Sequence, residues 1–444
     1  MTTLNRDAAQ ALLKKVLGYS KAEGCQATLN GATNGNIRYA RNSVSTSGVV
    51  YDQTLAVASN FGQRSGVATI NEFDDASLEK VVRRSEELAR LAPENPEFVE
   101  ILGPQQYAEA PGWFDSTAKI DAAYRGQAAA GSIGPARDSK AVAAGYLEHS
   151  AGFQAVANSK GLFGYYPATN ASFSVTVRSD DGTGSGWAGS EANDLGQLDV
   201  SGLSRTALEK ALRSREPKAI EPGKYTVILE PPAVIDLIGF MMFGFDARQA
   251  DEGRSFLAKP GGASKLGEKI VDERVTIYSD PTMPEAPVSP FAQDGRPRER
   301  TAWIEKGVVK NLFYSRFWAQ KKGVKATPFP GNGLMEGGSA SVADLVKDTA
   351  KGILVTRIWY LRFVDPQTVL LTGLTRDGTF YIENGAIAYP IKNMRFNESP
   401  VIMLNNIEAL GKPVRTASSE GISSVLVPPI KARDFTFTSL SDAV

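Results

Sequence analysis

Residues 224–256 have the sequence KYTVILEPPAVIDLIGFMMFGFDARQADEGRSF, which joins the most hydrophobic part of the chain to a run of charged side chains. Residues 224–230 predict a strand, and residues 231–243 predict a buried helix that begins with two prolines, which a first helical turn tolerates. Aspartate, arginine, glutamine and glutamate follow at once. These are the residue types of a working site, yet the stretch contains neither histidine nor cysteine.

Length and composition indicate a soluble globular protein with more than one domain. The chain has 444 residues, of which 42% are hydrophobic and 22% charged, a balance that allows a large buried interior. A chain of this length is too long for a single domain with one hydrophobic core, so two or three domains are expected. Lys plus Arg equals Asp plus Glu at 49 each, so no overall field attracts nucleic acid or an anionic membrane surface.

The sequence favours a cytoplasmic location. Residues 1–24 mix charged residues with Ala and Leu, which predicts a helix and not a signal peptide. The longest apolar run, residues 234–245, is about 12 residues long and contains Asp236, so it is too short and too polar to span a bilayer. The single cysteine, Cys25, excludes an internal disulfide and agrees with a reducing compartment.

Hydrophobic patterning predicts an α+β fold with two domains. Helical spacing over residues 5–22 and 75–91 flanks segments rich in β-formers, and residues 141–177 predict two long strands joined by a turn at 158–161. Proline and glycine interrupt the pattern at 216–223. We therefore expect an N-terminal α/β domain, 1–215, with a curved antiparallel sheet and helices, and a β-rich C-terminal domain, 216–444.

Two stretches of the second half are strong hairpin signals. Residues 303–309 (WIEKGVV) and 381–387 (YIENGAI) share the form aromatic, Ile-Glu-x-Gly, apolar. Lys-Gly and especially Asn-Gly pairs accept the positive φ that a two-residue hairpin turn requires. Their similarity is explained by shared turn chemistry without a duplicated unit.

The residue counts narrow the possible chemistry. A zinc hydrolase needs two or three imidazoles or thiolates, and the whole chain offers only His149 and Cys25. A Ser-His-Asp hydrolase would have to use His149, which lies in a predicted hairpin strand, and no Gly-x-Ser-x-Gly elbow occurs. A structural or solvent-facing role for His149 is therefore favoured. A Ser-Lys arrangement stays open, although no spacing singles out a pair.

A glycine-rich stretch at 262–269 (GASKLGEK) has the glycine spacing of a phosphate-binding loop. Glu268 stands where the loop needs its lysine, and no Ser or Thr follows Lys269. Without the cation and the metal-binding hydroxyl, phosphate binding is not expected there.

The order of segments across the chain resembles the TldD/PmbA family, also called the modulator of DNA gyrase family. The most specific pieces are GKYTVILEP at 223–231 and YIENGAIAYPIKN at 381–393, with SSVLVPPIKARDFTFTS following near the end. In that family the TldD type carries an H-E-x-x-x-H zinc motif after the equivalent apolar helix and a cysteine ligand near the C-terminus. The PmbA (TldE) type lacks them and pairs with TldD in a heterodimeric peptidase that acts on unfolded or small peptides.

This chain departs from the TldD pattern at all three expected ligands. The apolar helix leads into FDARQA at 245–250, which has no histidine, and the expected cysteine region, RTASSEGIS at 415–423, has no cysteine. The resemblance therefore implies a non-catalytic, PmbA/TldE-like subunit that contributes to a peptide-binding cleft and a dimer. No cofactor is expected in this chain, and zinc is expected only in a TldD-like partner.

Alternatives remain for both the function and the charged stretch. The chain could be a homodimeric binding or scaffold protein without proteolysis, or could hydrolyse substrate through an unrecognised serine or carboxylate site. The resemblance implies that Asp246, Arg248, Asp251 and Arg254 face a cleft or a partner subunit. The competing interpretation is a solvated helix end with local ion pairs, each of which contributes little.

Overall fold

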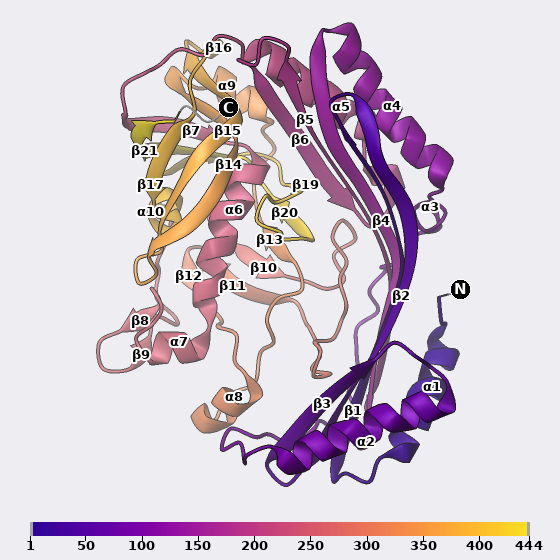
Figure 1. Ribbon diagram of the computed structural model, residues 1–444. Helices are drawn as coiled ribbons and strands as arrows, with labels where there is room; N and C mark the ends of the chain where they lie inside the picture. The colour runs from indigo at the N-terminus through magenta and orange to yellow at the C-terminus, as the bar shows by residue number, and fades with distance from the viewer. Residues whose placement is uncertain (1–2, 442–444) are drawn as a thin grey trace.

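The computed structural model describes residues 3–441 and has an α+β fold, as the sequence predicts. Its N-terminal half is built on a six-stranded antiparallel sheet with the order β3-β2-β1-β4-β5-β6, which is long and curved (Figure 1). The strands are β1 (Gly24–Ala40), β2 (Ser43–Phe61), β3 (Arg64–Ile70), β4 (Ala141–Asn158), β5 (Phe163–Ser179) and β6 (Ser185–Ala192).

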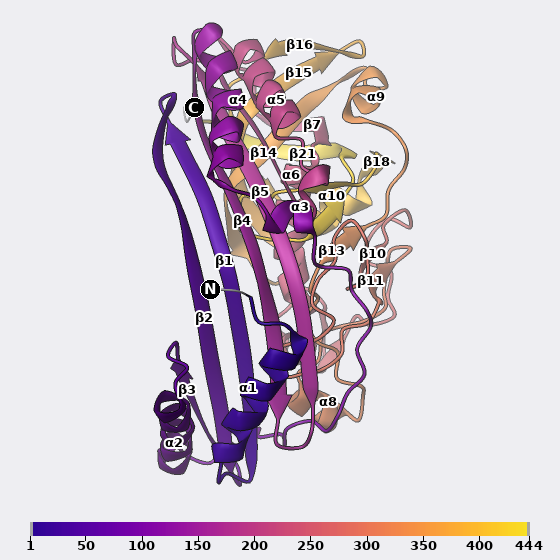
Figure 2. The same cartoon turned by 90° about the vertical axis from the view of Figure 1, so that its right-hand side faces the viewer.

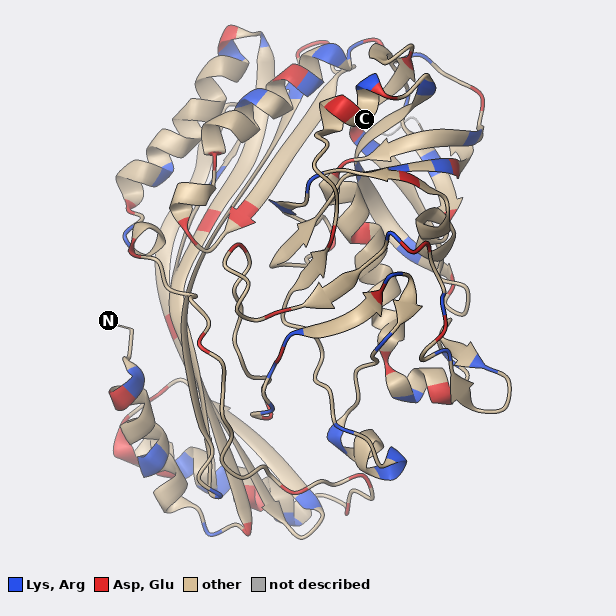
Figure 3. Ribbon diagram, turned by 180° about the vertical axis from the view of Figure 1, so that it is seen from behind, with Lys and Arg blue, Asp and Glu red and all other residues tan. Residues whose placement is uncertain are grey.

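Helices cover the outer face of this sheet, and the C-terminal half lies against its inner face (Figures 1 and 3). Each of the four main helices begins at a side chain that accepts a hydrogen bond from a free backbone amide, and these caps are Asn5, Asp74, Asp121 and Asp199. The helices are α1 (Arg6–Tyr19), α2 (Asp75–Leu91), α4 (Ala122–Asp138) and α5 (Val200–Arg213), with the short α3 (Asp115–Ala118).

The C-terminal half contains a ring of strands with no free edge between them. β14 pairs with β7, then β21, β17 and β15 follow, and β15 pairs again with β14. Such closure removes the unpaired backbone groups that an open sheet would present. The ring strands are β7 (Gly223–Leu229), β14 (Lys351–Asp365), β15 (Leu370–Glu383), β17 (Met394–Glu398) and β21 (Ile430–Leu440), with β16 (Ala386–Pro390) and β18 (Ile407–Leu410) attached.

A second six-stranded sheet of short strands completes this half. Its order is β12-β11-β10-β13-β20-β19, and β13 and β20 are parallel. The strands are β10 (Ile277–Ser279), β11 (Thr301–Glu305), β12 (Val308–Val309), β13 (Gly333–Met335), β19 (Val414–Thr416) and β20 (Val425–Val427). Short helices and one small hairpin occupy the connections: α7 (Ala247–Asp251), α8 (Arg316–Lys322), α9 (Val342–Lys347), α10 (Pro400–Asn405), β8 (Ala258–Lys259) and β9 (Ala263–Ser264).

The helix α6 (Pro231–Met242) is buried within the C-terminal half. Val234, Leu237 and Met241 have no exposed surface and belong to one hydrophobic core with residues of both sheets. The predicted strand and apolar helix at 224–243 are therefore confirmed. Among the helices that the structure describes, none has both the length and the hydrophobicity needed to cross a bilayer.

The predicted hairpins are confirmed, and their turns have the expected backbone. β11 and β12 are joined at Lys306 and Gly307, with φ of 50° and 78°, and β15 and β16 at Asn384 and Gly385, with φ of 52° and 76°. Two successive positive φ angles match the twist of the flanking strands. The β4–β5 turn uses Gly161, with φ of 89°.

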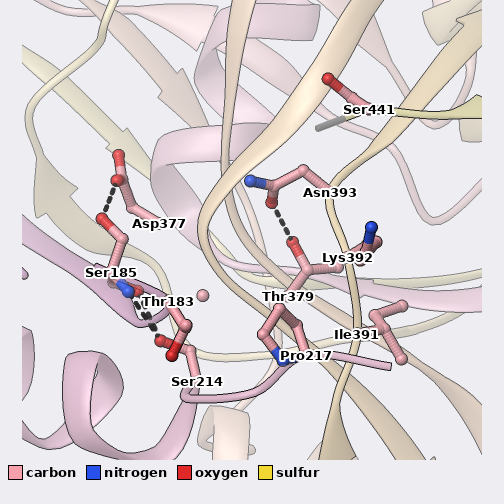
Figure 4. A pocket seen from close by; sticks show the side chains of 11 residues that line it. Thr183, Ser185, Ser214, Pro217, Asp377, Thr379, Ile391, Lys392, Asn393 and Ser441 are labelled. Atoms are coloured by element: carbon pink, nitrogen blue, oxygen red, sulfur yellow. Dashed lines mark hydrogen bonds between the residues drawn. The ribbon is translucent and has the colours of Figure 1, made fainter. Parts of the chain in front are cut away.

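Buried polar contacts connect the two halves. Ser185 of β6 donates a hydrogen bond to Asp377 of β15 (Figure 4). Arg357 of β14 donates to the same carboxylate at 2.7 Å. A cavity of about 110 Å³ lies beside this contact. The hydroxyl of Ser214, which also lines the cavity, bonds to the backbone of Ser185.

We predict that Gly186→Ala destabilises the protein. A Cβ at Gly186 would lie 2.1 Å from the Ala207 carbonyl oxygen of α5, so the helix must move away from β6. Overpacking of this kind costs about 1–3 kcal/mol, measured as the loss in free energy of unfolding by chemical denaturation. Gly131→Ala in α4 is the control, because nothing lies within 4 Å of its added Cβ. An equal effect of both substitutions would contradict the packing described here.

Candidate functional site

An apolar pocket of about 320 Å³ lies beside α6. Ile235, Ile238, Gly239, Met242 and Phe243 line it from the helix side at spacings of three and four residues, which place them on one helical face. Strands of the short-stranded sheet and residues 420–423 form the other walls, and the further lining residues include Ile277, Trp303, Phe329, Leu334, Ile422 and Val427. The pocket therefore joins the end of the apolar helix to the 415–423 segment.

Gly239 lets the 415–423 segment approach the helix. A Cβ at Gly239 would lie 1.9 Å from Cδ1 of Ile422, closer than two carbon atoms can come. The missing side chain leaves space for Ile422, which forms part of the pocket wall.

Asp236 fastens the same segment to α6. Its carboxylate has no exposed surface and accepts hydrogen bonds from the hydroxyls of Ser418 and Ser419 and from the Ser419 backbone N–H. Burial raises the pKa of Asp236 to about 6, although these hydrogen bonds act in the opposite direction. Asp236 therefore has a structural role: it holds the pocket wall in place, and its burial accounts for its raised pKa.

A polar cleft of about 530 Å³ separates the inner face of the N-terminal sheet from the C-terminal half. It shares Pro330, Gly331 and Ser423 with the apolar pocket, so the two spaces lie side by side. Hydrogen-bonding side chains line its sheet side, all uncharged except Asp52, and Arg298 lines the opposite side; the uncharged ones include Asn30, Asn34, Thr54, Gln154 and Asn170. Such a lining suits a ligand that has many hydrogen-bonding groups and little charge.

Tyr166 also lines this cleft. Its side chain is 5% exposed, and its hydroxyl has no hydrogen-bond partner among residues 3–441. Burial raises the pKa of this phenol, so it remains a donor at neutral pH. The hydroxyl oxygen itself has less than 1 Å² of exposed surface.

A buried ion pair joins the two halves close to the cleft. Arg415 contacts Glu191 at 3.2 Å and donates to Asn193 at 2.9 Å, and Asn193 lines the cleft. Burial raises the pKa of Glu191, and the nearby Arg415 opposes this shift. Arg415 begins the segment where the resemblance expects cysteine, so in this chain the segment connects the halves.

The four charged residues predicted for the site lie together on and beside α7, outside both cavities described above. Asp246 caps α7 by accepting from the Gln249 N–H at 2.8 Å, and Arg248 pairs with Glu252 at 2.8 Å and with Glu97 of the N-terminal half at 2.9 Å. One of these contacts is with the other half of the chain, and the proposed contact with a partner stays a prediction.

The other two predicted residues also have partners within the chain. Asp251 accepts from the indole N–H of Trp318 at 2.8 Å and pairs with Lys322 at 3.0 Å. Arg254 pairs with Glu252. All four therefore have partners within this chain.

His149 is a buried structural residue, as the sequence favours. Nη1 of Arg125 lies 3.1 Å from its Nε2, and burial together with this cation lowers the pKa of His149 to about 4. The imidazole is therefore neutral and accepts a hydrogen bond from α4. A Ser-His-Asp mechanism finds no support in this arrangement.

Comparison with known protein families shows which family this chain belongs to. The PmbA/TldA metallopeptidase central domain matches residues 114–215, and the C-terminal domain of the same family matches residues 222–439. The chain belongs to the PmbA/TldD family.

Sequence relatives of this family member come from bacteria and archaea. Metalloprotease PmbA of Escherichia coli O157:H7 is 25% identical over 228 residues, which are 50% of this chain and 48% of that protein. An uncharacterized protein of Methanocaldococcus jannaschii is 26% identical over 365 residues, 78% of this chain and 83% of that protein. The matched region thus spans about half the length of the bacterial relative.

Two solved structures share the fold of this PmbA/TldD family member. TldE from Thermococcus kodakarensis has a TM-score of 0.87 at 18% identity, covering 97% of this chain and all of that chain. A Thermotoga maritima protein described as a modulator of a DNA gyrase has a TM-score of 0.85 at 17% identity, with 97% and 100% coverage.

The residues of this chain do not fit the zinc that the family name implies. The pocket brings the apolar helix and the 415–423 segment together, and its lining contains neither imidazole nor thiolate. Across residues 3–441, no three side chains of His, Cys, Asp or Glu are grouped to hold a metal ion. Borderline-soft zinc needs such nitrogen and sulfur ligands.

Sequence reasoning missed the pocket, which lies along α6, whereas the site residues it named follow the helix. Part of the pocket could be read from the sequence, because Ile235, Ile238, Gly239 and Met242 recur at helical spacing and so share one face of the helix. The local sequence does not show that residues 420–423 cover this face of the helix.

We predict that Asp236→Asn changes the pH dependence of stability. Because the folded pKa of about 6 lies above the ordinary 3.8, wild-type protein loses stability as pH rises through this interval. The amide cannot titrate, so the variant gains stability relative to wild type between about pH 4 and pH 6. Denaturant unfolding at several pH values measures this difference. A difference that is constant with pH would show that Asp236 does not titrate in this window.

Proposed function

We propose that this chain is a non-catalytic, TldE-like subunit that binds peptide and supports proteolysis by a zinc-bearing TldD-like partner. One observation carries the proposal: the apolar helix that precedes the first expected ligand segment meets residues 420–423 of the second at one pocket, and the lining of that pocket holds no imidazole or thiolate. In this chain α6 and the 415–423 segment are in contact, but the pocket between them has no ligands for zinc. The partner would supply zinc, which lowers the pKa of bound water and makes hydroxide near neutral pH.

The cleft supports the peptide-binding part of this proposal. A peptide has one N–H donor and one C=O acceptor at most residues, and the amide and hydroxyl side chains of Asn30, Thr54 and Gln154 can meet both. The unpartnered hydroxyl of Tyr166 adds a buried donor. Because these groups would form hydrogen bonds with the peptide main chain and not with its side chains, the cleft would accept many peptide sequences.

A free sheet edge supports the dimer. β2 pairs with β1 along its length, whereas β3 covers only residues 55–61 of β2, so residues 43–54 form an edge (Figure 2). Val49 and Val50 there are 54% and 64% exposed, and Asp52 is the only charged residue of the twelve. Long, apolar edges pair readily with another strand. The edge borders the cleft through Asp52 and Thr54, so a second chain of the same fold placed there would extend the cleft wall.

Reconstitution tests the proposed role. We expect an untagged TldD-like relative from the same genome to form a complex with this chain and to cleave peptides at least about tenfold faster than alone. Val50→Lys should weaken the complex, because a charge on an edge strand disfavours pairing. Arg248→Ala with Asp251→Ala should weaken complex formation or turnover if α7 faces the partner or the cleft. Size-exclusion chromatography and peptide turnover are the measurements.

Val324→Lys is the control, since Val324 is 46% exposed and lies beyond α8. Absence of a complex, with this chain forming only its own dimer, would refute the subunit role and favour a homodimeric binding protein. If the paired alanine variant keeps both binding and turnover, the α7 residues are structural only.

A further inference from the structure

We propose that the apolar pocket beside α6 binds one large apolar side chain, such as Leu, Met or Phe, of a peptide whose main chain lies in the polar cleft. The inference rests on the proposed peptide binding and adds a substrate preference to it. It concerns a site that determines specificity and takes no part in bond cleavage.

The pocket and the cleft lie side by side and share part of one wall. Pro330, Gly331 and Ser423 line both spaces, so a peptide main chain in the cleft would lie next to the pocket at this junction. Gly331 carries no side chain there, and Cγ2 of Val288 lies 2.7 Å from where its Cβ would be. The proposal places the peptide side chain at this junction.

The interior of the pocket gives an apolar group a dry surface. Ile235, Ile238 and Trp303 are at most 3% exposed and present aliphatic or aromatic surface to it. The indole N–H of Trp303 is directed to the hydroxyl of Ser279 at 3.2 Å, so the polar atom of this side chain is already satisfied. Burying an apolar side chain here gains the full hydrophobic contribution.

Asn332 and Glu420 of the lining already have partners. Asn332 donates its amide hydrogens to the carbonyls of Asp280 and Ala286, and its oxygen accepts from the Asp280 N–H. Glu420 accepts from the Leu361 N–H at 3.2 Å and pairs with Arg362 at 3.9 Å. Most of the lining is aliphatic or aromatic, so a serine gains less there than a large apolar side chain, and burying a carboxylate is costly.

Binding of matched peptides tests this preference. We would use fluorescein-labelled Gly/Ser peptides with one central Phe, Leu, Ser or Asp, and measure anisotropy against the untagged full-length chain. The Phe and Leu peptides should bind at least about tenfold more tightly than the Ser peptide, and the Asp peptide most weakly. Ile422→Asp should remove the preference while the Ser peptide binds as before.

Controls separate the pocket from the rest of the molecule. Ile402→Asp, at a 53% exposed position on α10, should retain the preference. Met242→Gln at the pocket rim is a second variant in case Ile422→Asp unfolds, which thermal melting would reveal. It should reduce the preference several-fold.

The possible failures are distinct. Equal binding of the Phe and Ser peptides would overturn the pocket assignment and leave peptide binding in the cleft intact. A preference that survives both folded pocket variants would also overturn it. If none of the peptides binds, the proposed cleft function fails and the side-chain pocket fails with it.

Discussion

The structure of the C-terminal half depends on the burial of α6. A helix that is apolar on nearly every side must be enclosed by other elements, and here a closed ring of strands and a second sheet enclose it. Its one charged residue, Asp236, then requires partners in the interior, which Ser418 and Ser419 provide from 182 and 183 positions away in the sequence. That requirement fixes the segment 415–423 against the helix and so determines the wall of the pocket.

Hydrogen bonds and packing make the contact between α6 and the 415–423 segment. The Asp236 carboxylate binds Ser418 and Ser419, and Ile422 fills the space that Gly239 leaves. The resulting apolar pocket lies next to the polar cleft, and the β2 edge at residues 43–54 borders that cleft. In our proposal the pocket takes a peptide side chain, the cleft takes its main chain and the edge takes a second chain.

Much of the fold could be predicted because its signals are local. Asn384-Gly385 and Lys306-Gly307 identify hairpins by their φ requirements, and the two prolines at the start of α6 indicate where that helix begins. The site was harder, because charge clustering directed attention to Asp246 and Arg248. Their partners, Gln249 and Glu97, include one from the other half of the chain, which spacing cannot reveal. The pocket itself arises from long-range packing of short strands and a loop with no periodic pattern.

The most direct test of the central claim is zinc per chain by elemental analysis. The protein should be untagged and purified alone, because a histidine tag would import metal. The structure predicts zinc near zero, since the pocket between α6 and residues 415–423 presents no imidazole or thiolate. Zinc near one per chain would contradict the account and require a metal site built from His149, Cys25 or carboxylates.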